Sequence, residues 1–215
     1  SRAVNIGNDA YEKLGKDKCM SHLLNSPGNF TASKLKWVKE NEPEVYEKIY
    51  KYMLPGDFIA YKLTGEINTT RNGLSEGIIW DYKKNEIANW LLDFYGINPN
   101  LTPDLVDNFT NQGATNSKSS EETGLNIGIP ITYRAGDQPN NALALNVFDN
   151  GEVAASGGTS GVIYSITNDI NSKEPSRINH FAHVNYNDNN KSIGKLLCIN
   201  GCLLYTSPSP RDLST

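Results

Sequence analysis

A glycine-rich turn between two β-type runs constrains the fold of this chain more than any other feature. The run at residues 152–156 leads into Gly157-Gly-Thr-Ser-Gly161, and a second run follows at residues 162–167. Runs of this length around a glycine cluster predict two strands joined by a turn. Two more β-type runs, at residues 181–186 and 193–199, flank a polar turn. We therefore expect a β-rich section that begins near Gly151.

The chain before this section is predicted to be mainly helical, with a short β-type run at residues 130–134. Proline at the start of a helical pattern and glycine after its end are the strongest signals here. We expect helices over residues 8–24, after a cap at Thr31 or Ser33, from Pro43, from Pro55 to Gly65, over residues 87–95 before Gly96, after a capping box at Ser119 and Glu122, and from Pro139.

Composition excludes several classes of protein. Twenty basic and 24 acidic residues give a net charge of −4, which argues against a basic nucleic-acid surface. No apolar run approaches the roughly 18 residues of a membrane helix, so we expect no membrane partner. Three cysteines are too few for a disulfide framework and fit a reducing compartment, the cytoplasm. The chain begins at Ser1 without a signal peptide, and we expect its true N-terminus to be missing.

The sequence Ala-Gly-Asp137-Gln is the first candidate for catalysis. It lies between a β-type run and the helix expected at Pro139, and ligands of α/β proteins bind at such strand ends. A carboxylate there can accept the proton of an attacking hydroxyl. The glycine-rich turn can direct backbone N–H groups at an anion, and Thr159 and Ser160 add hydroxyl donors. Together, a base and a phosphate-binding turn are the minimum for phosphoryl transfer to an alcohol.

Each motif alone has a simpler interpretation. Asp137 can cap the helix that follows it, and the glycines can form an ordinary turn, since short motifs occur often by chance. His180-x-x-His183 is expected to be structural, and no metal site is predicted. A glycosidase-like carboxylate pair is less well supported than solvated surface carboxylates at Asp57, Glu76 and Asp81. The tryptophans are expected in the core rather than stacked on a sugar: Trp37, Trp80 and Trp90.

The combination and order of these motifs resembles the FGGY family of carbohydrate kinases. Asp137 precedes Thr159 by 22 residues, as in the central part of such kinases. Upstream, the segments Asn29-Phe-Thr-Ala-Ser-Lys-Leu-Lys-Trp-Val38 and Leu54-Pro-Gly-Asp-Phe-Ile-Ala-Tyr-Lys-Leu-Thr-Gly65 are similar to family segments. The resemblance covers residues 1–201. Tyr133-Arg-Ala-Gly-Asp-Gln-Pro-Asn-Asn-Ala142 and Phe181-Ala-His-Val184 are most similar to its xylulokinase branch.

The resemblance implies an incomplete α/β fold of the actin, Hsp70 and sugar-kinase (ribonuclease H-like) type. Residues 1–151 would be the later part of the sugar-binding domain, and residues 152–201 the start of the nucleotide-binding domain. The family's first phosphate hairpin, Asp-x-Gly-Thr, is not present in this sequence. Residues 202–215 contain two Ser-Pro pairs and are expected to be an unstructured, foreign tail.

The resemblance also assigns roles to residues. Asp137 would be the catalytic base, with Gln138 and Asn29 in contact with the sugar. The ATP phosphates would be bound by a set of turn residues: Gly158, Thr159, Ser160 and Gly161. ATP and Mg²⁺ are the implied cofactors, and no protein ligand for a metal is assigned.

The implied reaction is ATP-dependent phosphorylation of D-xylulose to D-xylulose 5-phosphate. Two alternatives stay open: a kinase of the same family for ribulose, fuculose or glycerol, and a sugar-binding module without activity. We expect the 215 residues alone to be inactive. The full-length protein would bind ATP and a small sugar, and a homodimer of it is compatible with the resemblance.

Overall fold

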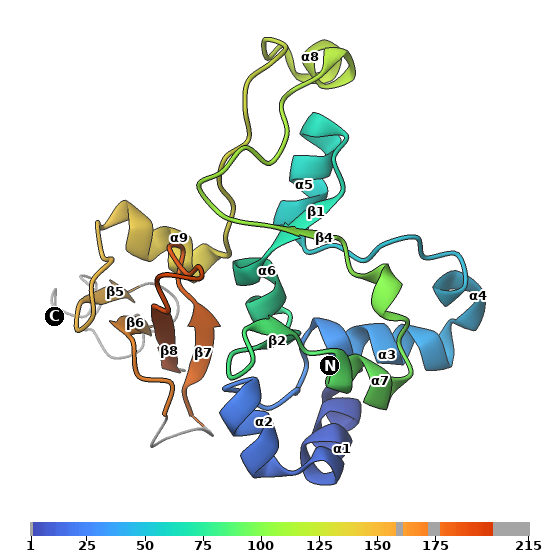
Figure 1. The fold of residues 1–215 in the computed structure, drawn as a ribbon, viewed down its shortest axis with the longest axis vertical. Helices are drawn as coiled ribbons and strands as arrows, with labels where there is room; N and C mark the ends of the chain where they lie inside the picture. The colour runs from blue at the N-terminus through green and yellow to red at the C-terminus, as the bar shows by residue number, and fades with distance from the viewer. Residues whose placement is uncertain (1, 158–160, 172–176, 200–215) are drawn as a thin grey trace, which may run out of the picture.

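The structure is a computed structural model that describes residues 2–157, 161–171 and 177–199. A helical body comes first in the chain, and an antiparallel sheet packs beside it (Figure 1). The helices are α1 (Val4–Leu14), α2 (Lys16–His22), α3 (Thr31–Asn41), α4 (Pro43–Tyr46), α5 (Pro55–Thr64), α6 (Arg71–Glu76), α7 (Asn89–Tyr95), α8 (Ser117–Thr123) and α9 (Asp137–Ala144), with a 3₁₀ turn at Pro99–Leu101. The strands are β1 (Asn68–Thr70), β2 (Trp80–Asp81), β3 (Glu86–Ile87), β4 (Asp104–Val106), β5 (Val153–Gly157), β6 (Gly161–Thr167), β7 (Asn179–Ala182) and β8 (Ile193–Ile199).

Proline and glycine set the ends of several helices as the sequence predicts. Pro55 opens α5, and Gly65 ends it in the left-handed region at φ 84°. Gly96 ends α7 in the same way at φ 62°. These positions tolerate the left-handed backbone because glycine has no Cβ. Within the described chain, no helix is long and apolar enough to cross a membrane.

Other helix predictions were wrong in detail. Gly15, at φ 93°, divides the helix expected over residues 8–24 into α1 and α2. No side chain caps α3, since Ser33 instead hydrogen-bonds the Tyr95 hydroxyl at 2.8 Å in the interior. The capping box of α8 lies three residues earlier than predicted, because Asn116 accepts from the Ser119 amide and Ser119 Oγ accepts from the Asn116 amide.

Two short strand segments also differ from prediction. Residues 130–134 form only an isolated bridge between Ala114 and Pro130, because the segment runs beside a loop rather than a strand. The helix expected from residue 87 begins at Asn89, since Glu86–Ile87 pairs with Trp80–Asp81. The parallel pair of β1 with β4, and helix α6 between them, were not predicted.

The two strands predicted around the glycine cluster are confirmed as β5 and β6, which pair in an antiparallel sheet of order β5-β6-β8-β7. Gly157 pairs with Gly161 at the end of the two strands where the chain passes from one to the other. Gly158, Thr159 and Ser160 lie outside the described residues. Further along the sheet, Gly194 lies under the Tyr164 ring so closely that a Cβ at this position would overlap the ring.

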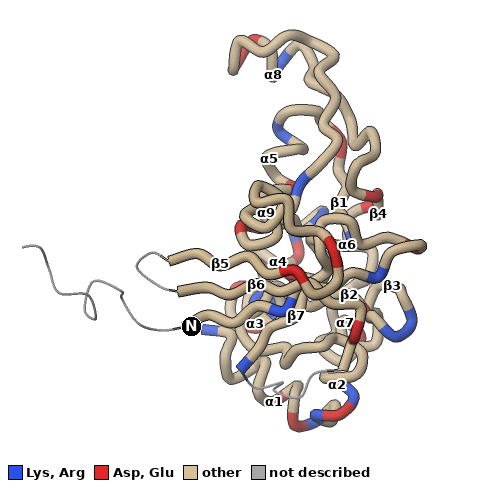
Figure 2. The backbone as a smooth tube through the Cα atoms, turned by 90° about the vertical axis from the view of Figure 1, so that its left-hand side faces the viewer, with Lys and Arg blue, Asp and Glu red and all other residues tan. Residues whose placement is uncertain are grey.

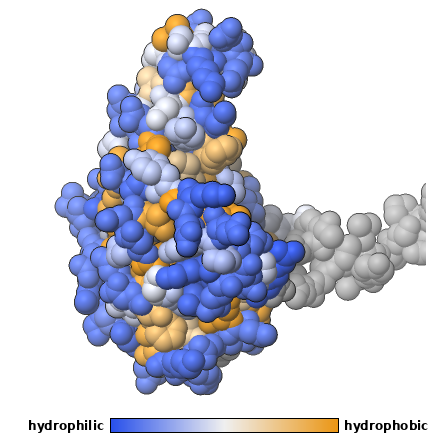
Figure 3. Space-filling model, turned by 90° about the vertical axis from the view of Figure 1, so that its right-hand side faces the viewer, coloured by the Kyte–Doolittle hydropathy of each residue, from blue (hydrophilic) through white to orange (hydrophobic). Residues whose placement is uncertain are grey.

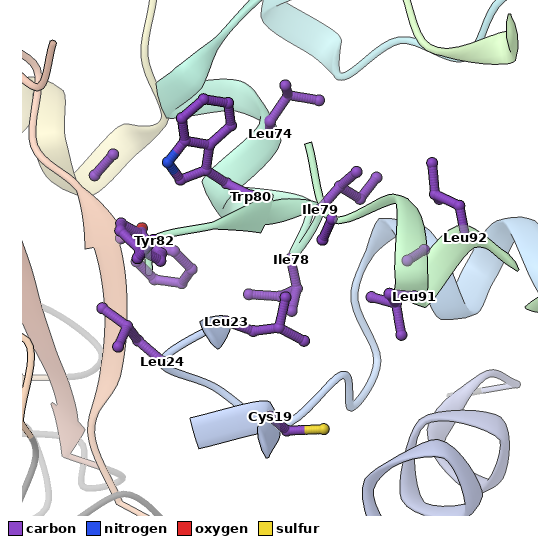
Figure 4. Close-up of a cluster of buried hydrophobic side chains, with 14 of the residues drawn as sticks. Cys19, Leu23, Leu24, Leu74, Ile78, Ile79, Trp80, Tyr82, Leu91 and Leu92 are labelled. Carbon is purple, nitrogen blue, oxygen red and sulfur yellow. The ribbon is translucent and has the colours of Figure 1, made fainter. Parts of the chain in front are cut away.

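The main core lies in the helical body and reaches one edge of the sheet. Figure 4 shows Trp80, Ile78 and Ile79 pointing into it from the chain around β2, with Leu91 and Leu92 of α7 opposite. Trp80 is 1% exposed, as predicted. Trp37 and Trp90 are only partly buried. Outside this body, α5 and α8 form an arm that projects from the molecule (Figures 1 and 3).

Side chains of the helical body occupy the outer edge of β7. Asn25 donates to the His180 carbonyl at 2.6 Å and accepts from the His180 amide at 2.9 Å. Asn72 of α6 donates to the carbonyls of Ala182 (3.0 Å) and His183 (2.5 Å). Buried backbone groups at a sheet edge need such partners, because an unpaired one costs free energy.

His180 and His183 are fully buried, as expected of structural residues. Nε2 of His183 lies 3.1 Å from the Val147 carbonyl, which can only accept, so Nε2 carries the proton. Nδ1 then accepts from the Tyr164 hydroxyl at 3.2 Å. Burial lowers the pKa of each histidine to about 4. His183 is therefore a neutral connector between the chain after α9 and strand β6.

Replacement of Asn72 by alanine should destabilise the chain. The substitution removes the donor of the buried Ala182 carbonyl, whereas the His183 carbonyl keeps its bond from the Tyr186 amide at 2.9 Å. A buried carbonyl left without a donor costs about 1–3 kcal/mol. We expect a lower midpoint in urea denaturation with an unchanged slope. Asn141→Ala, at an exposed position of α9, is the control and should change stability by less than about 0.5 kcal/mol. Equal midpoints for the two variants would contradict this account of the β7 edge.

The His183→Asn variant should differ from the wild type in its pH dependence. The unfolded wild type binds a proton at His183 below pH 6.5, whereas the folded protein does so only near pH 4. The stability that neutral His183 contributes is present above pH 6.5 and is lost as the pH falls toward 4. Relative to the variant, the wild type should lose about 1.4 kcal/mol between pH 7.5 and 5.5. Parallel stability profiles from urea denaturation would rule this out.

Candidate active site

A cavity of about 300 Å³ is lined by residues of α5, α6 and the start of α9. Figures 1 and 2 show how these three elements are arranged. Its walls come from segments that are far apart in the sequence. They are Leu54, Pro55, Gly56, Asp57, Thr70, Gly73, Glu76, Arg134, Ala135, Gly136 and Asp137. The cavity is at the lower end of the range of small-molecule sites, about 300–1,000 Å³.

Asp137 is the first residue of α9, and its side chain is exposed at this cavity. The segment before it is not a strand, contrary to prediction. Its Oδ1 accepts from the Gln138 amide at 2.9 Å, and its Oδ2 from Gln138 Nε2 at 3.2 Å. Both bonds come from the adjacent residue, so the carboxylate stays accessible to a hydroxyl group.

Gln138 connects Asp137 to the hairpin. Besides its bond to Asp137, it lines a small hollow together with Ser156 and Val162. Ser156 of β5 pairs with Val162 of β6, next to the turn. The candidate base and the strands that lead into the candidate phosphate-binding turn are therefore neighbours.

Asp57 and Arg134 form a buried ion pair in the cavity wall. Asp57 Oδ1 lies 2.9 Å from Arg134 Nε, and its Oδ2 accepts from Thr69 Oγ1 at 2.9 Å. Arg134 Nη2 also donates to Asn68 Oδ1. Burial raises the pKa of Asp57, while the charge of Arg134 opposes that shift. The expectation of a solvated carboxylate is wrong here, because Asp57 is 3% exposed.

Asp81 was also expected to be a solvated surface carboxylate, and this prediction is wrong as well. It is fully buried and accepts from His22 Nδ1 at 2.8 Å and from Trp90 Nε1 at 2.9 Å. The Lys84 amide also donates to it, at 3.0 Å. Asp81 thus serves the packing of α2 and α7 and does not line the cavity.

Glu76 is the third carboxylate of the cavity. It ends α6, is partly buried, and accepts from the Gly136 amide at 2.9 Å. A Cβ at Gly136 would overlap this carboxylate, which would then have to move away from its present position. Burial raises the pKa of Glu76 to about 7; the Gly136 bond opposes the shift, and the charges of Asp137 and Asp57 add to it. Sequence reasoning assigned Glu76 to the surface because it did not predict α6.

Of the remaining predicted site residues, the structure describes Asn29 and Gly161, and neither lines this cavity. Asn29 is a partly buried residue of the loop before α3 and is not part of the cavity wall. Gly161 is the first residue of β6. The other three residues of the predicted phosphate-binding turn lie outside the described part of the chain. The sugar and phosphate contacts predicted for these positions stay predictions.

The described residues do not fit a resident metal ion. No group of three or more His, Cys, Asp or Glu side chains in this part of the chain is arranged to hold one. Asp57 is already paired with Arg134, which leaves two carboxylates at the cavity. We therefore assign no protein ligand to Mg²⁺.

Comparison with known proteins decides the family. Residues 8–144 match the model of the FGGY family of carbohydrate kinases, N-terminal domain. The chain belongs to the FGGY family. It is 30% identical over 177 residues to the xylulose kinase of Staphylococcus xylosus, covering 80% of this chain and 37% of that protein. This chain thus spans little more than a third of the length of that relative.

Solved structures show the fold of this FGGY chain. Xylulose kinase from Rhodospirillum rubrum superposes with a TM-score of 0.84 at 22% identity, over 95% of this chain and 41% of that one. Plasmodium falciparum glycerol kinase with ADP superposes at 0.81 and 20% identity, over 92% and 40%. The prediction of an incomplete α/β fold of the actin, Hsp70 and sugar-kinase type is confirmed.

The Glu76→Gln variant should be more stable than the wild type at high pH. The pKa of Glu76 is about 7 in the folded state and 4.5 without the fold, so folding is favoured by protonation. That stability is present below pH 4.5 and is lost as the pH rises through 7. The stability advantage of the variant should therefore shrink by about 2 kcal/mol between pH 8 and 5.5. Glu86→Gln, at an exposed site, should show no such change; an equal change in both variants would refute the assignment.

Proposed function

We propose that this chain forms the acceptor side of an ATP-dependent sugar kinase that converts D-xylulose to D-xylulose 5-phosphate. One observation carries the proposal: Asp137, an accessible carboxylate at a cavity, adjoins the strands of a glycine-rich turn through Gln138. A proton acceptor next to an anion-binding turn is the arrangement that phosphoryl transfer to an alcohol needs. Similarity to the xylulose kinase of Staphylococcus xylosus supports xylulose as the acceptor.

Asp137 would act on the hydroxyl that attacks. As the sugar oxygen forms its bond to the γ-phosphorus, the bond from that phosphorus to the leaving ADP oxygen breaks. The hydroxyl proton passes to Asp137 as the attack proceeds. Gln138 holds both oxygens of Asp137 and so fixes the direction of the carboxylate. Gln138 and Asn29 remain the proposed contacts to the sugar.

The phosphates of ATP would meet the turn of Gly158, Thr159, Ser160 and Gly161. Backbone N–H groups in such a turn stabilise the charge that builds on the phosphoryl oxygens. Mg²⁺, bound to the phosphates rather than to described residues, would supply further charge neutralisation. Similarity in fold to the Plasmodium falciparum glycerol kinase, which was solved with ADP, supports a nucleotide as the second substrate.

The charges of the cavity favour a neutral acceptor. Arg134 neutralises Asp57, which leaves Glu76 and Asp137 as acceptors for hydroxyl groups. An anionic sugar would be repelled by Asp137, whereas ribulose, fuculose and glycerol would not. A panel of these neutral acceptors against D-xylulose, in a coupled assay of ADP release, separates the members of this group. A non-catalytic sugar-binding module would bind an acceptor and release no ADP.

The same proposal includes the organisation of the protein. It places the domain boundary near residue 151, with a sugar-binding part before it and residues 152–201 in the nucleotide-binding part. Residues 202–215, predicted to be a foreign tail, lie outside the described residues. The low cysteine count supports the cytoplasm as the compartment. Homodimer formation belongs to the full-length protein in this proposal.

Asp137→Asn tests the role of the base in a full-length protein that carries this chain. The amide keeps the shape but cannot take the proton, so kcat should fall about 10²–10⁴-fold. Affinity for the sugar, measured by calorimetry, should change little. The matched control is Asp149→Asn, at an exposed position after α9, which should keep wild-type turnover. Near-normal kcat in Asp137→Asn would remove Asp137 from the mechanism. The 215 residues alone should release no ADP.

A further inference from the structure

We propose that Glu76 is a positioning residue that holds Asp137 in place through the backbone of Gly136. The inference rests on the proposed function, because it gives Glu76 a role relative to Asp137 as the base. Glu76 does not itself need to touch the reacting atoms. Its effect on turnover would pass through the peptide that precedes α9.

Both Glu76 and Gly136 contribute to their contact, the first with an acceptor and the second with a donor and free space. The Gly136 amide donates to Glu76 Oε1 at 2.9 Å. Gly136 precedes α9, in which Asp137 is the first residue, so a shift of this peptide moves Asp137 directly. Because Gly136 has no side chain, the carboxylate occupies the space that a Cβ would fill.

Helix α6, which carries Glu76, is held in place by hydrogen bonds at both of its ends. Thr70 caps the helix by accepting from the Gly73 amide at 3.1 Å. Asn72 donates to the carbonyls of Ala182 and His183, and Ser75 Oγ accepts from the Ala182 amide at 3.0 Å. Glu76 follows Ser75 directly. Catalytic groups need to be held to within about 0.5 Å by supports of this kind.

The groups around Glu76 make its charge sensitive to pH. Asp57 of α5 and Asp137 of α9 are the acidic groups that face it. Arg134 lines the same cavity but is paired with Asp57. Tyr133, before α9, and Tyr164 of β6 also interact with it electrostatically, and burial raises the pKa of each, so they are neutral near pH 7.

Ionised Glu76 should hold Gly136 more tightly than the protonated form. Hydrogen bonds to a charged acceptor are roughly twice as strong as neutral ones. Since the pKa of Glu76 lies at about 7, its hydrogen bond with the Gly136 amide should weaken as the pH falls below that value. Positioning of Asp137 would thus vary over the neutral range.

The sequence offers a direct probe of this bond. Ala135-Gly136 is the only Ala-Gly pair in the chain. Labelling alanine with ¹³C at the carbonyl and glycine with ¹⁵N therefore gives a single amide signal in a carbonyl-correlated NMR spectrum. We expect the Gly136 proton shift to titrate with a midpoint between pH 6 and 8. The titration should vanish in Glu76→Gln and persist in Asp137→Asn and in the control Glu86→Gln.

Two results of the titration would overturn the inference. One is a Gly136 signal that does not move between pH 6 and 8. The other is a titration that persists in Glu76→Gln. Neither result depends on kinase activity, so the titration tests Glu76 even if the proposed function fails.

Kinetics of the full-length protein test the consequence for turnover. Glu76→Ala should lower kcat by about 10–100-fold, since a displacement near 1 Å can cost this much. The Kd for the sugar should change less than threefold. Glu76→Gln keeps an acceptor for Gly136, so it should recover most of kcat and lose the dependence on pH near 7. Unchanged kcat in Glu76→Ala, beside a large loss in Asp137→Asn, would reject the inference alone. Unchanged kcat in both would reject the proposed function.

Discussion

The outer edge of β7 is closed by side chains instead of by another strand, and the rest of the structure depends on this contact. Asn25, Asn72 and Ser75 supply donors and acceptors to the backbone from His180 to His183. A strand edge pressed against helices would otherwise bury unpaired N–H and C=O groups. These hydrogen bonds therefore hold the helical body and the sheet together at a fixed distance. They also fix which residue of β7 faces which helix.

Helix α6 transmits this arrangement to the candidate site. Only six residues long, it has too few internal bonds to be stable by itself. Its order comes from Asn72 and Ser75 on the sheet side and from Glu76 on the side of Gly136. The same helix thus contacts the edge of the sheet and the peptide before α9. On the proposed function, α6 therefore helps to position both the sheet that leads into the phosphate turn and the base that meets the sugar.

The sequence predicts elements whose signals are local. Proline at 55, glycines at 65 and 96, and the alternating runs of β6 and β8 each indicate their own structure. Burial of Asp81 depends on His22, which is 59 residues away, and burial of Asp57 depends on Arg134. Helix α6 is short and owes its order to distant strands. Such elements cannot be inferred from periodicity, because their stability comes from tertiary contacts. Asp137 is a candidate from sequence because its motif is contiguous, whereas nothing near Glu76 in the sequence indicates its contact with Gly136.

On the proposed function, the acceptor side and the phosphate side of the reaction centre would have opposite electrostatic characters. The cavity presents Glu76 and Asp137, whose oxygens accept from hydroxyl groups and repel phosphate. A phosphate bound beside them needs donors from elsewhere, and a glycine-rich turn provides such donors without a positive side chain. The carboxylates would then bind the sugar hydroxyl and repel phosphate, and the turn would bind phosphate in preference to a hydroxyl. Such an arrangement would favour attack of the hydroxyl along the line between the two sides, because the carboxylates would repel the phosphoryl group from the acceptor side.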